Sequence, residues 1–268
     1  MIIVVTKEGN HSNRLFHSIH LEAFAREHNC NFYDPTFSDL AHYYNISSHW
    51  YDRYLLIIFN KIKGRFKLKL HHFSEDYFIQ HEPKFDILKK RIAFVSGWFF
   101  FQKELTLKYK DYFQRKYTLS GDVLNNILKN ENYNLRKLLS KISDAEVVLG
   151  VHIRRGDYIS WENGKYFYDD IVYQAAILKL KALCGQKKML IIIFSNESFD
   201  AEFSEDTYVS NNKWYVDHYL MGLCDYLIGP PSTFTLWASY IGPKAKYFHM
   251  NHKNDLPVSL EDFKIYNG

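Results

Sequence analysis

The segment that decides the fold spans residues 146–158 and reads EVVLGVHIRRGDY. Residues 146–153 are mostly apolar and β-branched, which is typical of a strand buried in a parallel sheet. Two arginines, a glycine and an aspartate follow the strand at once: Arg154, Arg155, Gly156 and Asp157. Because ligands of doubly wound sheets bind beyond the carboxyl ends of the strands, we expect this loop to belong to a binding site.

Arg154 and Arg155 present adjacent guanidinium groups, whose rigid sets of N–H donors match the oxygens of a phosphate. Gly156 permits a sharp turn, and Asp157 can hold one guanidinium group in place, with Arg155 as the favoured partner. The loop therefore predicts a diphosphate clamp. A plain surface loop held by a salt bridge is the alternative.

Outward from this loop, strands and helices alternate along the second half of the chain. We predict strands at residues 146–153, 189–194, 226–229 and 245–249, and helices at 166–184, 214–224 and 232–241. Ser195, Asn196 and Glu197 follow one strand, while Ser232 and Thr233 open a helix whose free N–H groups favour an anion. Ser232 acting only as a helix cap remains the alternative.

The first half opens with a predicted strand at 2–6, a helix at 13–28 capped by Ser12 or Asn13, and a strand at 30–33. This order is a βαβ unit and indicates a parallel sheet. Further on, the pattern predicts a strand at 91–98 and helices at 103–117 and 122–143, whereas residues 40–90 show no sustained period. We expect an α/β protein with two Rossmann-like domains, 1–145 and 146–268.

Composition narrows the class of protein. The 268 residues carry a net charge of +4, which divides into +7 for residues 1–145 and −3 for 146–268. Lys61, Lys63, Arg65, Lys67 and Lys69 alternate with apolar or small residues, which indicates an extended segment that is either a solvated edge or a contact with an anionic membrane. No nucleic-acid-binding motif accompanies this charge. Three scattered cysteines, no signal-peptide pattern and no long apolar stretch predict a cytoplasmic protein.

Four ordered motifs then resemble one family. Residues 152–158 (HIRRGDY) resemble the H-x-R-R-G-D-[YF] motif of bacterial α-1,2-fucosyltransferases. Residues 194–197 (FSNE), 217–224 (DHYLMGLC) and 231–238 (PSTFTLWA) resemble later motifs of the same family, in the same order. In the first half, residues 12–16 (SNRLF) resemble a G-N-[QR]-[ML]-F loop with Ser12 in place of glycine, and residues 97–102 (GWFFFQ) resemble a G-Y-F-Q segment.

The resemblance implies a GT-B fold, with two Rossmann-like domains facing a central cleft. It also implies inverting transfer of fucose from GDP-fucose to a glycan hydroxyl, without a metal or another cofactor. The 1–145 domain would then be the acceptor side and 146–268 would bind the GDP-sugar. The expected acceptor is an O-antigen or capsule-type oligosaccharide, joined in α-1,2 linkage and carried on a lipid at the inner membrane face. An enzyme for another GDP-linked deoxysugar and a non-catalytic GDP- or glycan-binding relative are the alternatives.

The resemblance also implies roles for individual residues. Arg154 would contact the diphosphate, with Arg155 as its support, and His152 would contact the nucleotide or its phosphate. The remaining donor-binding residues would be Ser195, Asn196, Glu197, Ser232, Thr233, Phe234, Asn13 and Arg14. Ser195, Asn196 and Glu197 would line the guanosine pocket, where Glu197 would matter most because a carboxylate can accept from both N1–H and the 2-amino group of guanine. Absence of a D-x-D pair fits a metal-free site. The candidates for a general base, by residue type alone, are Asp157, His11, His17 and Glu8.

Overall fold

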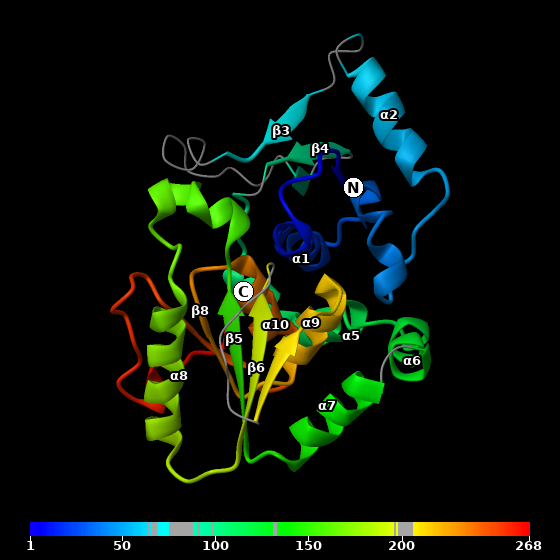
Figure 1. Ribbon diagram of the computed structural model, residues 1–268. Coiled ribbons are helices and arrows are strands. Elements are labelled where there is room, and N and C mark those ends of the chain that lie inside the picture. The colour runs from blue at the N-terminus through cyan, green and yellow to red at the C-terminus, as the bar shows by residue number, and fades with distance from the viewer. Residues whose placement is uncertain are drawn as a thin grey trace. The chain divides into compact units, whose positions relative to one another are not determined.

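The computed structural model describes residues 1–63, 65, 69–74, 88–89, 92–97, 99–130, 133–195, 197 and 206–268. Two compact units make up the chain, each built on its own parallel sheet (Figure 1). Unit 1 comprises Met1–Ser120 with Asn267–Gly268, and unit 2 comprises Gly121–Tyr266. The α/β class with parallel sheets is thereby confirmed. Relative to the expected domains, unit 2 begins earlier, because α6 (Gly121–Asn130) and α7 (Tyr133–Asp144) group with it.

Unit 1 contains a four-stranded sheet in the order β2-β1-β4-β3, in which every pairing is parallel. Its strands are β1 (Ile2–Val4), β2 (Phe32–Tyr33), β3 (Leu70–His72) and β4 (Ala93–Ser96). Helix α1 (His11–Glu27) joins β1 to β2, as the βαβ pattern predicts. Leu21 and Phe24 of α1 pack into one core cluster with Ile2, Val4 and Val95 of the sheet.

Helix α1 begins two residues earlier than expected. Asn10 occupies the N-cap position without a side-chain bond, so the predicted capping by Ser12 or Asn13 is wrong and both lie in the first helical turn. The predicted helix at 103–117 is divided into α4 (Lys103–Lys108) and α5 (Lys110–Lys116). The break lies at Tyr109, whose φ of −101° and ψ of 17° depart from helical geometry.

The short helical turn η1 (Pro35–Phe37) follows β2, and the described part of residues 40–90, left unassigned in the sequence, contains the turn η2 (Ala41–Tyr43) and the helix α2 (Asp52–Ile62). Lys61 lies in the last turn of α2 and Lys63 has αR backbone angles, so the extended alternation expected from Lys61 is wrong at its start. Lys67 lies outside the described residues. Strand β3 begins only at Leu70.

Unit 2 contains a five-stranded parallel sheet in the order β7-β6-β5-β8-β9. Its strands are β5 (Val147–Ile153), β6 (Met189–Ser195), β7 (Thr207–Ser210), β8 (Tyr226–Gly229) and β9 (Lys246–His249). From the central β5 the chain winds outward through β6 and β7, then returns to the other side of β5 to form β8 and β9. Four of these strands were predicted, whereas β7 was not.

Helices cover both faces of this sheet. Successive side chains of β5 point to opposite faces and therefore pack against different helices. Leu149, Val151 and Ile153 pack with Tyr173 and Ile177 of α8 (Asp170–Cys184). His152 points to the other face, where its ring stacks on Phe234 of α10 (Thr233–Ile241). Helix α9 (Trp214–Gly222) packs beside α10 on that face, as His218 and Phe234 stack on each other. Short 3-10 turns, η4 (Gly156–Ile159), η5 (Trp161–Gly164) and η6 (Leu260–Asp262), complete the unit.

Among the described residues, no helix combines the length and the apolar character needed to cross a bilayer.

Candidate functional site

The winding order places a candidate site at the carboxyl ends of β5 and β8. These two strands are neighbours in the sheet but lie on opposite sides of the point where the strand order reverses, with Val151 paired to Ile228. In open α/β sheets such a switch point is where ligands bind. The loop after β5 carries the arginine pair, and the loop after β8 leads into α10. The Tyr158 hydroxyl donates a 2.6 Å hydrogen bond to the carbonyl oxygen of Pro231, so the two loops are in contact.

Arg154 is held by Asp157 at the mouth of the β5 loop. Its Nη2 lies 2.9 Å from Oδ1 and 3.0 Å from Oδ2 of that carboxylate. Its guanidinium carbon lies 5.6 Å from the ring centre of Tyr158. The side chain keeps 27% of its surface exposed, so the carboxylate and the ring orient the guanidinium group while solvent or a ligand can still reach it. This placement is compatible with the predicted phosphate contact.

Arg155 pairs with Asp170 on the first turn of α8, and not with Asp157. The preferred Asp157–Arg155 pair was therefore wrong. The reason is the extended backbone of the loop, since Arg155 has φ −123° and ψ −150°. Extended residues alternate sides, so Arg155 follows Ile153 toward α8 while Arg154 points away from it.

We expect Asp170→Ala to destabilise unit 2 by about 1–2 kcal/mol, because it removes the carboxylate from a largely buried guanidinium group. Thermal unfolding would measure the loss. The matched control is Asp169→Ala, since Asp169 is exposed and its side chain makes no cap bond. Equal stability of the two variants would show that the Arg155–Asp170 pair contributes nothing.

His152 is buried at the end of β5 in a stack of three rings. Its ring centre lies 5.6 Å from that of Phe234, which in turn lies 3.8 Å from that of His218. The pKa of His152 is lowered to about 3, mainly by burial and further by the charges of Arg154 and His249. The imidazole is therefore neutral at physiological pH. Its Nδ1 is buried and has no hydrogen-bond partner in the structure, which leaves one polar atom for a ligand to satisfy.

Ser232 caps α10, as the alternative reading of the sequence held. Its Oγ accepts a 3.2 Å hydrogen bond from the backbone N–H of Phe234. The hydroxyl of Thr235 donates to the carbonyl oxygen of Ser232 at 2.8 Å and lies 2.7 Å from Nε2 of His249. Thr233 is the first residue of the helix and is partly exposed. These contacts fix the helix start against β9.

The predicted guanosine-pocket residues lie after β6, on the other side of β5. Ser195 ends β6 directly beside Ile153 of β5. The backbone N–H of Glu197 donates to Ser195 Oγ at 3.2 Å, and the Glu197 side chain is exposed. Asn196 lies outside the described residues. Unit 2 thus brings His152, Arg154, Ser195 and Ser232 to the same edge of one sheet, while the part played by Glu197 in binding guanine stays a prediction.

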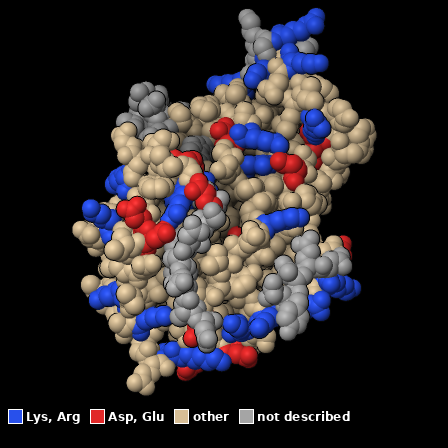
Figure 2. Space-filling model, viewed as in Figure 1, with Lys and Arg blue, Asp and Glu red and all other residues tan. Residues whose placement is uncertain are grey.

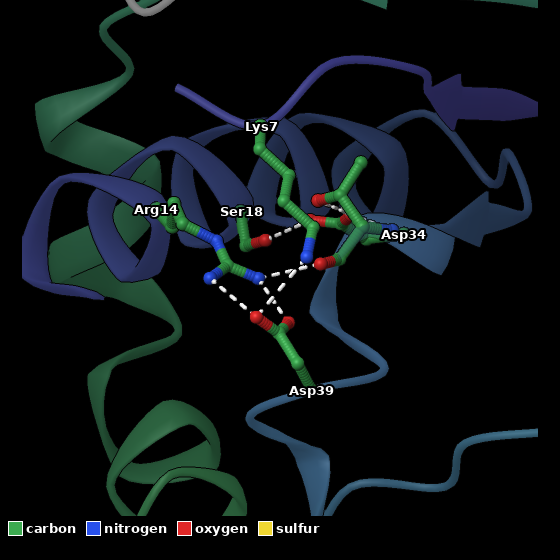
Figure 3. A network of polar contacts seen from close by, with 6 residues as sticks. Lys7, Arg14, Ser18, Asp34 and Asp39 are labelled. Atoms are coloured by element: carbon green, nitrogen blue, oxygen red, sulfur yellow. Dashed lines mark hydrogen bonds and ion pairs between the residues drawn. The ribbon is translucent and has the colours of Figure 1, made fainter. Parts of the chain in front are cut away.

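Asn13 and Arg14 belong to unit 1, where Arg14 is held inside a polar network (Figure 3). Its Nη2 lies 2.6 Å from Asp39 Oδ1 and also donates to the carbonyl oxygen of Thr36. Lys7 contacts the same Asp39 carboxylate at 3.1 Å. These contacts lower the pKa of Asp39 to about 2, against the opposing effect of burial. Through these contacts the buried guanidinium group of Arg14 stabilises the turn after β2. A contact between Arg14 and the sugar donor stays a prediction.

Three of the general-base candidates, Glu8, His11 and His17, lie in the same unit. Glu8 Oε1 accepts hydrogen bonds from the Thr6 hydroxyl at 2.6 Å and from the backbone N–H of Gly97 at 2.9 Å. His17 is buried, which lowers its pKa, so its ring is neutral near pH 7. His11 is the first residue of α1. Nothing in these contacts selects one of them as the base.

Several residues at the site were missed by the reasoning on residue types. Asp170 contacts Arg155, His218 stacks on Phe234 and the charge of His249 acts on His152, yet none of the three stands at a spacing that would reveal it. Asp217, although part of a quoted motif, received no role. Its carboxylate accepts from the hydroxyl of Ser210 at the end of β7, and burial raises its pKa to about 7. Only the packing of α9 against β7 creates these surroundings.

The raised pKa of Asp217 predicts a pH-dependent stability. A folded-state pKa near 7 against 3.8 means that the folded protein holds this proton more tightly than the unfolded chain. The resulting stabilisation is present below about pH 4 and is lost as pH rises to about 7. We expect Asp217→Asn to gain about 1–2 kcal/mol over the wild type across this window and to keep that advantage above it. Melting curves from pH 4 to 8 test this, with exposed Asp169→Asn as the control. A constant difference at every pH contradicts it.

Within the described residues, no group of three or more His, Cys, Asp or Glu side chains is arranged to hold a metal ion.

Solved structures of fucosyltransferases are similar to this chain in fold. The fucosyltransferase NodZ from Bradyrhizobium superimposes with a TM-score of 0.57 at 13% identity, covering 96% of this chain and 99% of NodZ. NodZ α-1,6-fucosyltransferase soaked with GDP-fucose gives 0.56 at 14% identity over the same shares, 96% and 99%. A mutant of Arabidopsis thaliana FUT1 in complex with GDP gives 0.59 at 12% identity, covering 94% of this chain and 71% of that one.

These neighbours are GT-B-type enzymes, and the similarity confirms the expected fold class. A search of curated protein sequences found no match. The sequence pattern of Glycosyl transferase family 11 matches residues 52–255, which is most of the chain and spans the whole candidate site in unit 2. The chain therefore belongs to Glycosyl transferase family 11.

Proposed function

We propose that the protein transfers fucose from GDP-fucose to a hydroxyl of an oligosaccharide, with inversion and in α-1,2 linkage. The observation that carries the proposal is the position of Arg154 at the switch point of the second sheet, next to the capped start of α10. Membership of Glycosyl transferase family 11 supports sugar transfer. The structures of NodZ with GDP-fucose and of FUT1 with GDP support the choice of donor.

The leaving GDP is the chemical problem that these residues would address. Fucosyl transfer breaks the bond between the anomeric carbon and the β-phosphate oxygen, so negative charge grows on the diphosphate. Arg154, oriented in advance by Asp157, would stabilise that charge without reorganising at the moment of reaction. Ser232 and Thr233 at the start of α10 would meet the same phosphates through hydroxyl and N–H groups. Arg155, bound to Asp170, would hold the shape of the loop.

Activity is expected to survive EDTA, because arginine and helix N–H groups would perform the charge stabilisation that a divalent cation performs in other glycosyltransferases. The rate of GDP release in chelated buffer, compared with buffer containing Mg²⁺ or Mn²⁺, measures this. A cation that accelerates GDP release by less than a few fold would still agree with a metal-independent reaction. A requirement that titrates with added metal would overturn the metal-free reading.

The donor and the linkage need separate experiments. A thermal-shift series with GDP-fucose, other GDP-sugars and GDP tests the donor, and we expect GDP-fucose to stabilise the protein most among the sugars. Transfer to defined galactose-terminated oligosaccharides, followed by mass spectrometry and NMR, tests the linkage. NodZ is an α-1,6 enzyme, so an α-1,6 product here would overturn the α-1,2 assignment while leaving fucosyl transfer intact. GDP-fucose that neither stabilises the protein nor reacts would refute the proposed function itself.

The proposed acceptor is an O-antigen or capsule-type oligosaccharide carried on a lipid, and the proposed location is the cytoplasmic face of the inner membrane. The support for this is the family resemblance and the basic first half of the chain. A lipid-linked acceptor and its soluble, lipid-free form should then differ in KM. Equal KM values with vesicles present would argue against a membrane-bound acceptor.

A further inference from the structure

Helix α2 of unit 1 carries large apolar side chains that are exposed. Two of its residues attach it to the unit: Asp52 accepts hydrogen bonds from the Tyr33 hydroxyl and the backbone N–H of His49, and the ring of buried Phe59 lies 4.8 Å from that of Phe94. These anchors are seven residues apart, which is about two helical turns, so they lie on one side of α2.

The side of α2 away from these anchors exposes large apolar side chains, together with Lys61 near the end of the helix. The exposed fractions are 56% for Tyr54, 44% for Ile57 and 50% for Ile58, and Trp50, just before the helix, is 84% exposed. Tyr51, 38% exposed, and Leu55, 39% exposed, lie beside these residues on the flank of the helix nearer the anchors. Soluble proteins seldom leave adjacent large apolar side chains in water unless they bind something there. We refer to these six residues, Trp50, Tyr51, Tyr54, Leu55, Ile57 and Ile58, as the α2 face.

Positive charge surrounds the α2 face. Between residues 50 and 69 the sequence holds six Lys or Arg residues and one acidic residue, Asp52, which is buried. Arg53, Lys61 and Lys63 are exposed, and within the part of the chain that the structure describes none of the three forms an ion pair. In Figure 2, blue side chains gather at the C-terminal end of α2.

We propose that α2 lies in the surface of an anionic lipid bilayer, with the α2 face among the acyl chains and Arg53, Lys61 and Lys63 at the headgroups. An amphipathic helix with aromatic and aliphatic residues on one side and basic residues at its flanks has the chemistry of an interfacial helix. Charge separates this occupant from a second copy of the chain. A two-fold dimer would bring the same basic residues of both copies together, which is unfavourable, whereas anionic lipids attract them. The inference is independent of the proposed sugar transfer.

Vesicle co-sedimentation of the full chain tests the proposal. We expect binding to vesicles of phosphatidylcholine with about 30% phosphatidylserine, little binding to phosphatidylcholine alone, and a steep loss as salt is raised. Arg53→Gln/Lys61→Gln/Lys63→Gln should weaken partitioning by about 100-fold. Ile57→Gln/Ile58→Gln should weaken it by about tenfold or more at unchanged charge.

Matched variants in unit 2 control for charge and hydrophobicity. Lys187→Gln/Lys188→Gln/Lys253→Gln removes the same charge from exposed positions, and Ile171→Gln/Leu178→Gln removes two apolar side chains that are 71% and 67% exposed. Both controls should bind like the wild type. Circular dichroism and thermal unfolding establish that every variant is folded.

Trp50 gives a second readout. Its emission should shift to shorter wavelength on anionic vesicles and be quenched by lipids brominated on the acyl chains, and Trp50→Phe should lose most of both signals. Equal binding of the α2 variants and their controls would overturn the proposal. So would a wild-type protein that ignores anionic vesicles at low salt while forming a dimer that Ile57→Gln/Ile58→Gln dissociates in sedimentation velocity.

Discussion

Replacing Arg154 with alanine is expected to lower the rate of sugar transfer by about 10²–10³ while the protein remains folded. In the proposed reaction the guanidinium group would stabilise the charge of the departing diphosphate, and removing it would leave that charge without this donor. Stability should change little, because Asp157, its ion-pair partner, is 59% exposed and is solvated by water when Arg154 is absent. Turnover at saturating donor and acceptor, together with thermal unfolding, separates the two effects.

Two further variants sharpen the Arg154 experiment. Lysine at position 154 should recover only a small part of the rate, since an ammonium point charge does not reproduce the fork of donors. Arg136→Ala removes the same kind of side chain from an exposed position in α7 and should transfer sugar at the wild-type rate. Near-normal turnover of a folded Arg154→Ala protein would eliminate the clamp.

Replacing Gly229 with alanine is expected to destabilise unit 2 by about 1–3 kcal/mol and to weaken donor binding at the same time. Gly229 ends β8, and a Cβ atom there would clash with the carbonyl oxygen of His152 and lie 3.0 Å from its Cβ. The carbonyl group of His152 belongs to the backbone of β5, so it cannot rotate away as the end of a side chain can. The neighbouring ends of β5 and β8 must therefore move apart, and with them the Arg154 loop and the start of α10.

Gly121→Ala is the control for Gly229→Ala, because a Cβ atom at Gly121 meets nothing within 4 Å. Alanine there, at the first position of α6, should be neutral or slightly stabilising. Urea unfolding and the dissociation constant for GDP, measured for both variants, test the pair. A Gly229→Ala protein with wild-type stability would mean that the strands accommodate the methyl group, and the close approach of β5 and β8 would lose its importance for the site.

The second sheet was largely predictable because its strands are nearly continuous apolar runs. Residues 147–153 are buried throughout in β5, and β6 is almost as apolar, so their sequences carry the signature of central parallel strands. Strand β7 lies at the edge of the sheet and alternates less clearly, with Val209 exposed. A short edge strand is specified by its neighbour β6 more than by its own residues, which is why no periodicity revealed it.

Helix α2 was missed for a different reason. Its buried residues are few, and its exposed side carries isoleucine, leucine and tyrosine where a solvent-facing helix carries polar residues. Residues 55–59 are also five consecutive apolar residues, and such a run does not distinguish a helix from a strand by its period. The same property that hides the helix in the sequence makes it a candidate for an interface.

The partners of the arginine pair could not be derived from spacing alone. Asp157 lies close to both arginines in the sequence, whereas Asp170 reaches Arg155 only because α8 packs on the face toward which Arg155 points. Which carboxylate holds which guanidinium group depends on the direction of the backbone after β5. That direction is a property of the loop conformation, to which Gly156, at φ +61°, contributes a turn that other residues rarely adopt.

The position of β5 at the middle of its sheet has a consequence for how the protein folds during synthesis. Hydrogen bonds tie β5 to the residue just before β8 across 77 residues: the N–H of Asp225 donates to the carbonyl oxygen of Val148, and the N–H of Val148 donates to the Asp225 carboxylate. Until the ribosome has delivered β8, one edge of the most completely buried strand in the sheet has no neighbour, and its unpaired N–H and C=O groups can recruit other chains. Such long-range parallel pairing also slows folding, because the entropy of closing a long loop is lost before the stabilising contacts form. Nascent chains stalled between residues 153 and 225 should thus be the species that depend most on chaperones.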